Sequence, residues 1–144
     1  MKAESKFQIF DAVPGSLEPI RDFIAAFATA NNIERKKIFK LSLAVDEIAT
    51  NIMNYGYPLA GIDDGTIQVS IGYQNKQLKV VLEDRAMPFN PIEKGMPTPE
   101  DLMKPVEDRP IGGLGIFLAR QSVDLFDYEY REGKNRNIFV VAID

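Results

Sequence analysis

Two early segments of the chain carry apolar residues at helical spacing, with every third or fourth residue on one face. The first follows a short strand predicted over residues 6–13, and Ser16 is expected to cap it. The second runs from about Glu34 to Tyr55 and is expected to stop at Gly56-Tyr57-Pro58. The apolar stripes are Leu17, Ile20, Phe23, Ile24 and Phe27 in the first helix, and Ile38, Leu41, Val45, Ile48 and Ile52 in the second.

Strict alternation of apolar and polar residues then predicts strands. Ile67, Val69 and Ile71 share one face of a segment that opens at Gly65, and Leu78, Val80 and Leu82 continue the alternation after a tight turn at residues 74–76. Two final strands are expected near residues 125–130 and 137–143, around a turn at residues 132–135. The order of elements predicts an α+β fold, a two-layer sandwich with a mostly antiparallel, mixed sheet and helices on one face.

No regular element fits residues 92–111, which are rich in proline and charge. A loop of this length in a compact domain is typical of a functional lid or of disorder. The sequence shows no internal repeat and no boundary, so residues 1–144 are predicted to form one domain.

Composition excludes several kinds of chemistry. The 144 residues contain no Cys and no His, so the chain can build no thiolate site, imidazole metal site or Ser-His-Asp triad. A general base must therefore be a carboxylate or, failing that, Lys or Tyr. The net charge of −4 argues against nucleic-acid binding. No apolar run suits a signal peptide or a membrane span, so a soluble, cytoplasmic protein is expected.

A polar stripe interrupts the second helix. Glu47, Asn51 and Asn54 fall within about 60° of one another at helical geometry, in line with Leu43 and Ala44. Such a mixed face indicates a pocket wall, on which an Asn oxygen can bind Mg²⁺ and a Glu can accept a proton. Taken alone, Glu-x-x-x-Asn is a common motif and is more often explained by the solvated polar face of an amphipathic helix.

Two further motifs follow along the chain. Asp84 ends a predicted strand, where a carboxylate can accept a hydrogen bond from an exocyclic amine such as that of adenine, although an Asp after a strand often only forms a turn. Gly112-Gly113-Leu114-Gly115 directly precedes a predicted helix, and glycines at a helix N-terminus let backbone N–H groups approach an anion. The spacing matches neither a P-loop nor a dinucleotide-binding fingerprint. A flexible helix start is the alternative for the glycines.

In this order, Glu47-x-x-x-Asn51, Asp84, the loop and Gly112–Gly115 resemble the Bergerat (GHKL) ATP-binding fold from about residue 8 to 142. Within that superfamily the chain looks most like the stand-alone anti-sigma-factor serine kinases of bacteria. The likeness includes residues 44–51 (AVDEIATN), a Pro-Phe-Asn-Pro turn at residues 88–91 and residues 133–137 (GKNRN).

The resemblance implies a role for each matching residue. Glu47 would activate a serine hydroxyl, Asn51 would hold Mg²⁺, and Asp84 would bind the adenine amine of ATP. Residues that would contact the nucleotide elsewhere are Thr50, Asn54, Arg109, Gly112, Gly113, Leu114 and Gly115. Ala86 departs from the family pattern, which places Gly there, and is expected to weaken binding if a positive φ or close approach is needed. Arg21 would face a partner.

The implied function is an ATP-dependent serine-protein kinase and anti-sigma-type regulator. Its partners would be a STAS-type (anti-anti-sigma) antagonist, phosphorylated on serine, and a sigma factor or similar target, and the protein would form a homodimer. A non-catalytic nucleotide-binding module that regulates a partner is the alternative, supported by Ala86 and opposed by Glu47. An ATP hydrolase like the larger relatives ranks last, since those proteins couple hydrolysis to additional domains.

Overall fold

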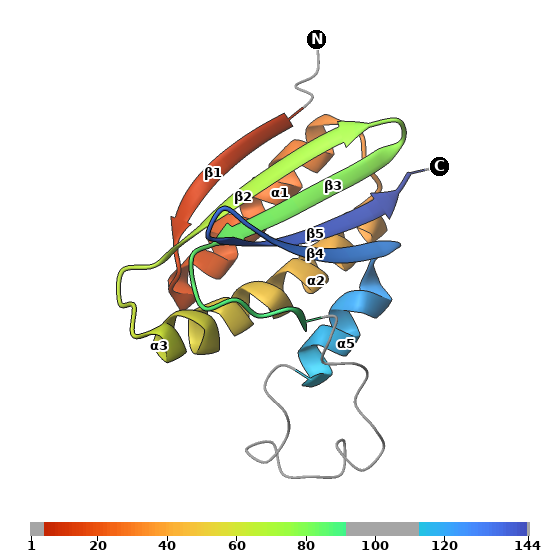
Figure 1. Cartoon of the computed structure of the whole chain (residues 1–144). Coiled ribbons are helices and arrows are strands. Elements are labelled where there is room, and N and C mark those ends of the chain that lie inside the picture. Colours follow the sequence, from red (N-terminus) through yellow and green to blue (C-terminus); the bar gives the residue numbers. More distant parts are fainter. Residues whose placement is uncertain (1–4, 92–112, 144) are drawn as a thin grey trace.

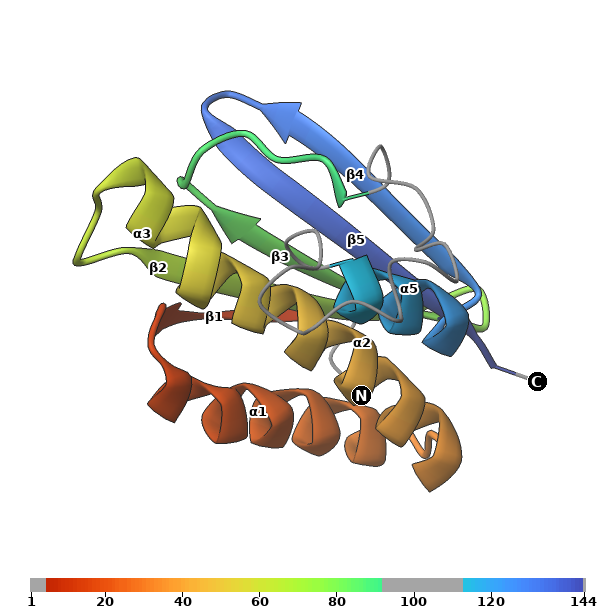
Figure 2. The same cartoon turned by 90° about the horizontal axis from the view of Figure 1, so that it is seen from below.

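The computed structural model describes residues 5–91 and 113–143, which form two layers. One layer is a five-stranded sheet in the order β1-β2-β3-β5-β4, and each neighbouring pair is antiparallel. The other layer holds the helices, which all lie against one face of the sheet (Figures 1 and 2). The strands are β1 (Ser5–Asp11), β2 (Thr66–Gln74), β3 (Gln77–Asp84), β4 (Leu125–Arg131) and β5 (Lys134–Ala142). The predicted α+β two-layer class is confirmed.

The helical layer is built from α1 (Leu17–Ala30), α2 (Arg35–Asn51) and α5 (Gly113–Ser122). Helix α1 follows a 3₁₀ turn (Pro14–Ser16), and Ser16 occupies the N-cap position as predicted, but it has helical backbone angles and its side chain makes no capping bond. Helix α2 lies between α1 and α5 beneath the sheet (Figure 2). Because it is central, α2 presents one side to the sheet and the other to the surface.

The second helix is longer than its sequence pattern predicts. A π-helical turn (Ile52–Gly56) and a short helix α3 (Tyr57–Ala60) continue α2 past the expected stop. Pro58 does not break the helix because it lies in the first turn of α3. Proline has no backbone N–H, and at this position none is needed for a helical hydrogen bond. The helix ends instead at Gly61, whose φ of +71° is the left-handed conformation typical of a helix end.

Both hairpins use two-residue turns with positive φ at both positions. These residues are Asn75 and Lys76 between β2 and β3, and Glu132 and Gly133 between β4 and β5. Such turns match the right-handed twist of antiparallel strands. Both turns lie where they were predicted, and each is shorter than the expected span, which was residues 74–76 for the first and 132–135 for the second. Strand β5 therefore begins at Lys134 and includes Asn135.

The core lies between the layers, and the predicted inward faces are confirmed. Ile67, Val69 and Ile71 of β2, like Leu78, Val80 and Leu82 of β3, are at most 1% exposed. They pack with the apolar faces of α1 and α2, including Ile20, Ile24, Leu41 and Val45. No helix in the described part of the chain is long and apolar enough to cross a membrane.

Gly65 is required by packing rather than by backbone angle. A Cβ at this position would lie 2.5 Å from three atoms of the Tyr57 ring, and that ring is buried. We therefore expect Gly65→Ala to lower the free energy of unfolding by about 1–3 kcal/mol, the usual cost of overpacking. Urea denaturation measures the change. Gly15→Ala is the matched control, because a Cβ there meets no atom within 4 Å; an equal loss in both variants would contradict this explanation.

Candidate nucleotide-binding site

A cavity of about 230 Å³ lies between α2 with its π-helical turn, the segment that follows β3, and the start of β5. Ile48 and Ile52 line it on the helical side, and Met87 and Phe89 line it on the opposite side. Its polar lining comes from Asn51, Asp84, Asn135 and Asn137. Apolar walls with a few convergent polar groups are typical of a small-molecule site.

Asp84 ends β3 and is only 3% exposed. Its Oδ1 accepts hydrogen bonds from Asn135 Nδ2 at 2.9 Å and from the backbone N–H of Ala86 at 3.0 Å. Within the described residues, no hydrogen bond involves Oδ2. The described residues therefore hold one carboxylate oxygen of Asp84, and none of them holds the other.

Burial is the largest influence on the Asp84 carboxyl and raises its pKa above the ordinary value of 3.8. The hydrogen bonds from Asn135 and from the Ala86 N–H lower the pKa, and so offset part of this effect. Burial therefore disfavours the charged form of Asp84 relative to an exposed carboxyl. Perturbation by burial in a cavity is typical of functional carboxylates.

Asn135 joins Asp84 to the segment that follows it. Besides Asp84, its Nδ2 donates to the carbonyl oxygens of Met87 at 3.0 Å and Ala86 at 3.3 Å. Its Oδ1 accepts from the Phe89 N–H at 3.1 Å and from the Tyr128 hydroxyl. The side chain therefore holds the cavity wall from Asp84 to Phe89 in place.

Tyr57 holds the same segment from the helical side. Its hydroxyl oxygen accepts a hydrogen bond from the Arg85 N–H at 2.9 Å and donates one to the Thr66 carbonyl. The buried Tyr57 ring follows the π-helical turn directly, so the helical extension beyond Gly56 fixes the start of the Asp84–Phe89 segment.

Ala86 is 6% exposed and lines the cavity. It is not among the described non-glycine residues with positive φ, so alanine causes no backbone strain of that kind here. A Cβ built on Gly56 would lie 3.2 Å from the Ala86 Cβ. The Ala86 methyl therefore faces Gly56, and the absence of a side chain at residue 56 makes room for it.

The residues predicted on α2 separate into two environments. Asn51 lines the cavity, and its Nδ2 is buried with no hydrogen-bond partner among the described residues. Glu47 lies one turn before Asn51, and Thr50 immediately precedes it. Both are half-buried, and neither lines the cavity. Asn54 is exposed in the π-helical turn, where the wider helix changes its angular position relative to α2.

The pKa of Glu47 is raised above the ordinary value of 4.5, first by desolvation and then by the negative charge of Asp46. A raised carboxyl pKa brings proton affinity nearer to that required of a general base at neutral pH. Asp46 itself pairs with Arg21, whose Nη1 lies 2.7 Å from Asp46 Oδ2. Arg21, predicted to face a partner, thus connects α1 to the residue beside Glu47.

The glycine motif is described only in part. Gly113, Leu114 and Gly115 form the first turn of α5, which lies beside α2 with Ile116 and Ala119 buried (Figure 2). Arg109 and Gly112 fall outside the described residues, as does the predicted lid. The part of the chain that the structure describes has no group of three or more acidic, His or Cys side chains that could hold a metal ion.

The family model for the histidine kinase-like ATPase domain matches residues 10–141 of this chain. The chain belongs to that family. It is 31% identical to the serine-protein kinase RsbW of Bacillus mycoides (strain KBAB4) over 94 residues. This aligned region covers 65% of this chain and 57% of that protein. It is 28% identical to the protein of the same name in Bacillus thuringiensis (strain Al Hakam) over 116 residues. This aligned region covers 79% of this chain and 70% of that protein.

The fold comparison agrees with the sequence comparison. A crystal structure of the RsbU and RsbW domains of a Mycobacterium tuberculosis protein matches 97% of this chain and 32% of that one, with a TM-score of 0.68 and 13% sequence identity. The resemblance to the bacterial anti-sigma-factor serine kinases, stated from the motifs, is confirmed.

Sequence reasoning did not identify Asn135, Asn137 and Tyr57 as site residues. Asn135 and Asn137 are both 3% exposed and face the core side of β5, and Asn137 Oδ1 is buried without a partner among the described residues. Two amides on the inward face of an otherwise apolar strand were the available signal, since buried polar groups need partners.

The raised pKa of Asp84 predicts a pH-dependent cost. A carboxyl whose pKa is higher in the folded than in the unfolded protein contributes most stability below the unfolded value, and the contribution is lost as pH rises through the folded pKa. Asp84→Asn keeps an oxygen for the Asn135 and Ala86 donors but removes the charge. We expect its free energy of unfolding without ligand to equal or exceed that of the wild type at pH 7.

The advantage of Asp84→Asn should shrink as pH falls toward 3.8, because the wild-type carboxyl is then protonated as well. Urea denaturation of both proteins between pH 4 and pH 8 measures this difference. Glu47 is present in both proteins, so its own pH-dependent effect on stability cancels in the comparison. An advantage that stays constant over this range would contradict the assignment.

Proposed function

We propose that this chain is an ATP-dependent serine-protein kinase and anti-sigma-type regulator that phosphorylates a serine of a STAS-type antagonist protein. The observation that carries the proposal is buried Asp84, which lines an apolar-walled cavity and has one carboxylate oxygen that no described residue holds, next to the helix that bears Asn51 and Glu47. Its cellular setting would be the cytoplasm, its second partner a sigma factor or similar target, and its assembly a homodimer.

The cavity suits adenine. Asp84 Oδ2 would accept a hydrogen bond from the exocyclic amine, while the base packs between Ile52 and Met87. Asn135 and Tyr57 keep the wall in its binding geometry before the ligand arrives, which reduces the cost of ordering it. Gly113 to Gly115 open α5 beside α2, where backbone N–H groups and the helix dipole favour phosphate.

Asn51 would hold Mg²⁺ through its side-chain oxygen together with phosphate oxygens. The ion supplies charge neutralisation of the triphosphate. An amide nitrogen does not ligate Mg²⁺, so the Asn51 oxygen would be the atom that contacts the cation. Thr50, Asn54, Leu114, Gly112 and Arg109 remain proposed nucleotide contacts.

Glu47 would act as the base for phosphoryl transfer. The serine oxygen forms a bond to the γ-phosphorus, the bond from that phosphorus to the β–γ bridging oxygen breaks, and ADP leaves with the electron pair. The hydroxyl proton passes to the Glu47 carboxylate. Because the Glu47 pKa is raised by burial and by Asp46, the carboxylate binds this proton more readily than an exposed Glu would.

The second candidate is a nucleotide-binding module that regulates a partner without catalysis. Ala86, where the family pattern has Gly, favours it, because the added methyl occupies cavity wall. The retained and perturbed Glu47 favours the kinase, since a binder needs no base. The two candidates differ in whether phosphate leaves the nucleotide.

Glu47→Gln tests the proposal. We expect the variant to transfer phosphate from Mg-ATP to a STAS-domain protein of the same organism about 10²- to 10⁴-fold more slowly, because it lacks the proton acceptor. Mg-ATP should still raise its unfolding temperature, because binding depends on Asp84 and Asn51. Radiolabelled phosphate transfer and thermal unfolding provide the two measurements.

Glu34→Gln is the control, since Glu34 is exposed and its side chain makes no capping bond. Phosphate transfer by Glu47→Gln at the wild-type rate would show that Glu47 is not the base. Stabilisation by Mg-ATP without transfer to any STAS-domain protein would leave the regulatory module as the function.

A further inference from the structure

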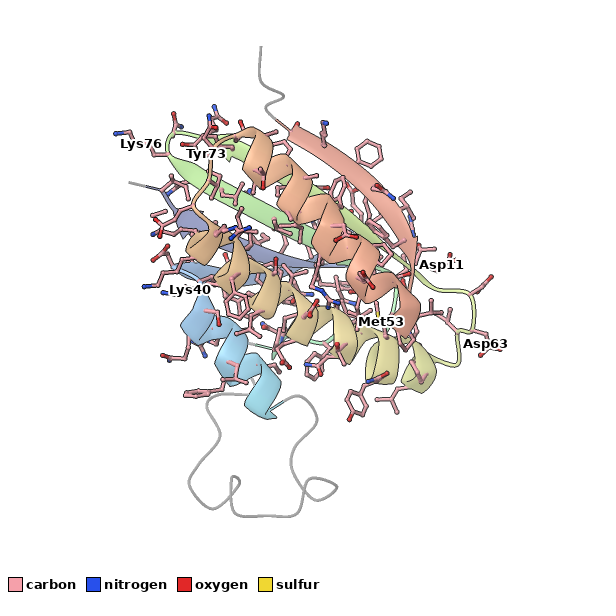
Figure 3. The ribbon with its side chains drawn as sticks, turned by 180° about the vertical axis from the view of Figure 1, so that it is seen from behind. Asp11, Lys40, Met53, Asp63, Tyr73 and Lys76 are labelled. Atoms are coloured by element: carbon pink, nitrogen blue, oxygen red, sulfur yellow. The ribbon has the colours of Figure 1, made fainter. Side chains whose placement is uncertain are left out.

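The N-terminal half of α2 has an exposed surface that stability does not explain. Phe39 is 68% exposed and Leu43 36% exposed, on a helix whose opposite side forms the core. Lys36 and Lys40 flank them and are exposed as well. Figure 3, which looks onto the helical layer, labels Lys40 at its edge beside α5. We call these four residues the α2 ridge.

The charges on this end of α2 oppose the helix dipole. Arg35, Lys36 and Lys37 are its first three residues, and the first turn contains no acidic residue. Cations near a helix N-terminus are unfavourable, because they face the positive end of the helix dipole. Lys37 donates to the Ala142 carbonyl, but no ion pair joins Lys36 or Lys40 to any described residue. A basic cluster at this place in an acidic protein indicates an acidic binding partner.

The α2 ridge lies on the same face of the helix as Glu47, the proposed base. With about 100° per residue, Lys36, Lys40 and Leu43 lie within about 40° of Glu47 around the helix axis, and Phe39 lies next to Leu43. At about 1.5 Å per residue, Phe39 is only about 12 Å along the helix from Glu47. The exposed surface and the carboxylate therefore belong to one continuous helix face.

A protein that brings a hydroxyl to Glu47 must cover the surroundings of Glu47. A standard interface buries about 800 Å² on each partner, which corresponds to a radius of about 16 Å. An interface centred near Glu47 would thus extend over Leu43 to Phe39. Aromatic residues, including Phe, are enriched in the buried cores of such interfaces.

We propose that the α2 ridge is the docking surface for the phospho-acceptor protein, which presents an acidic, partly apolar face to it. The inference rests on the proposed kinase function. Phe39 and Leu43 would bury apolar surface, Lys36 and Lys40 would orient the partner, and the acceptor serine would reach Glu47 along the same face. Phe39, Lys36 and Lys40 act in docking and take no part in nucleotide binding.

The test uses the full-length protein with Mg-ATP and the purified STAS-domain proteins encoded in the same genome. The variants are Phe39→Ser and the double charge reversal Lys36→Glu/Lys40→Glu. We expect each to raise the KM for the acceptor at least about tenfold, as loss of an interface anchor does, with kcat nearly unchanged. The thermal stabilisation by Mg-ATP should stay at the wild-type value, which a general loss of folding would not allow.

Ile9→Ser and Lys79→Glu are the matched controls, because both residues are exposed on the strands of the sheet layer. Their acceptor KM should equal that of the wild type. If a ridge variant has the wild-type acceptor KM, or if a control variant raises the acceptor KM equally, the α2 ridge is not the docking surface. The proposed kinase activity would be unaffected by either result. Acceptor binding that depends on the ridge but gives no transfer would support the surface and overturn the kinase. If none of the STAS-domain proteins binds the wild type, the proposed occupant is wrong.

Discussion

The buried carboxylate of Asp84 is the constraint on which the site depends. A charged group in an apolar cavity is costly unless hydrogen bonds compensate it. Here Asn135 and the Ala86 N–H compensate one oxygen. The antiparallel pairing of β3 and β5 makes this possible, because it places Asp84 directly opposite Asn135. The sheet register thus determines which side chain stabilises the carboxylate, and no described residue holds the other oxygen.

The helical layer completes the site through one continuous element. Helix α2 carries Glu47 and Asn51, and its π-helical turn and α3 bring Gly56 and Tyr57 against the segment after Asp84. A π-helical insertion is frequent at functional sites because it shifts the helix phase without ending the helix. The pairing of Ala86 with Gly56 shows that the cavity wall is fitted locally, with one methyl accommodated by the absence of another.

Much of the fold follows from periodicity. The alternation in β2 and β3 and the apolar stripes of α1 and α2 predicted the core faces, because burial on one side forces these patterns. The continuation of the helix past Gly56-Tyr57-Pro58 was not predictable, since local signals favour a stop and only the tertiary contact of Tyr57 with Gly65 and Arg85 favours continuation. Ser16 takes the predicted N-cap position, but as the last residue of the 3₁₀ turn it has helical backbone angles, and its side chain makes no capping bond.

The site was predictable where it depends on residue type and order, and not where it depends on register. Asp84 and Asn51 were assigned from motifs, and the structure brings both to one cavity. Asn135 was expected in a turn, so its role became visible only with β5 beginning at Lys134. Asn54 was placed on the α2 stripe by an unbroken helical period, which the π-helical turn interrupts.

The central claim is that Asp84 recognises an exocyclic amine on a purine nucleotide. Isothermal titration with Mg-ATP and with Mg-inosine triphosphate tests it directly, because the two nucleotides differ at the position of that amine. A site whose buried acceptor loses its donor should discriminate strongly, so we expect the inosine nucleotide to bind at least about tenfold more weakly. Equal affinity for the two nucleotides, or binding of neither, would contradict the account.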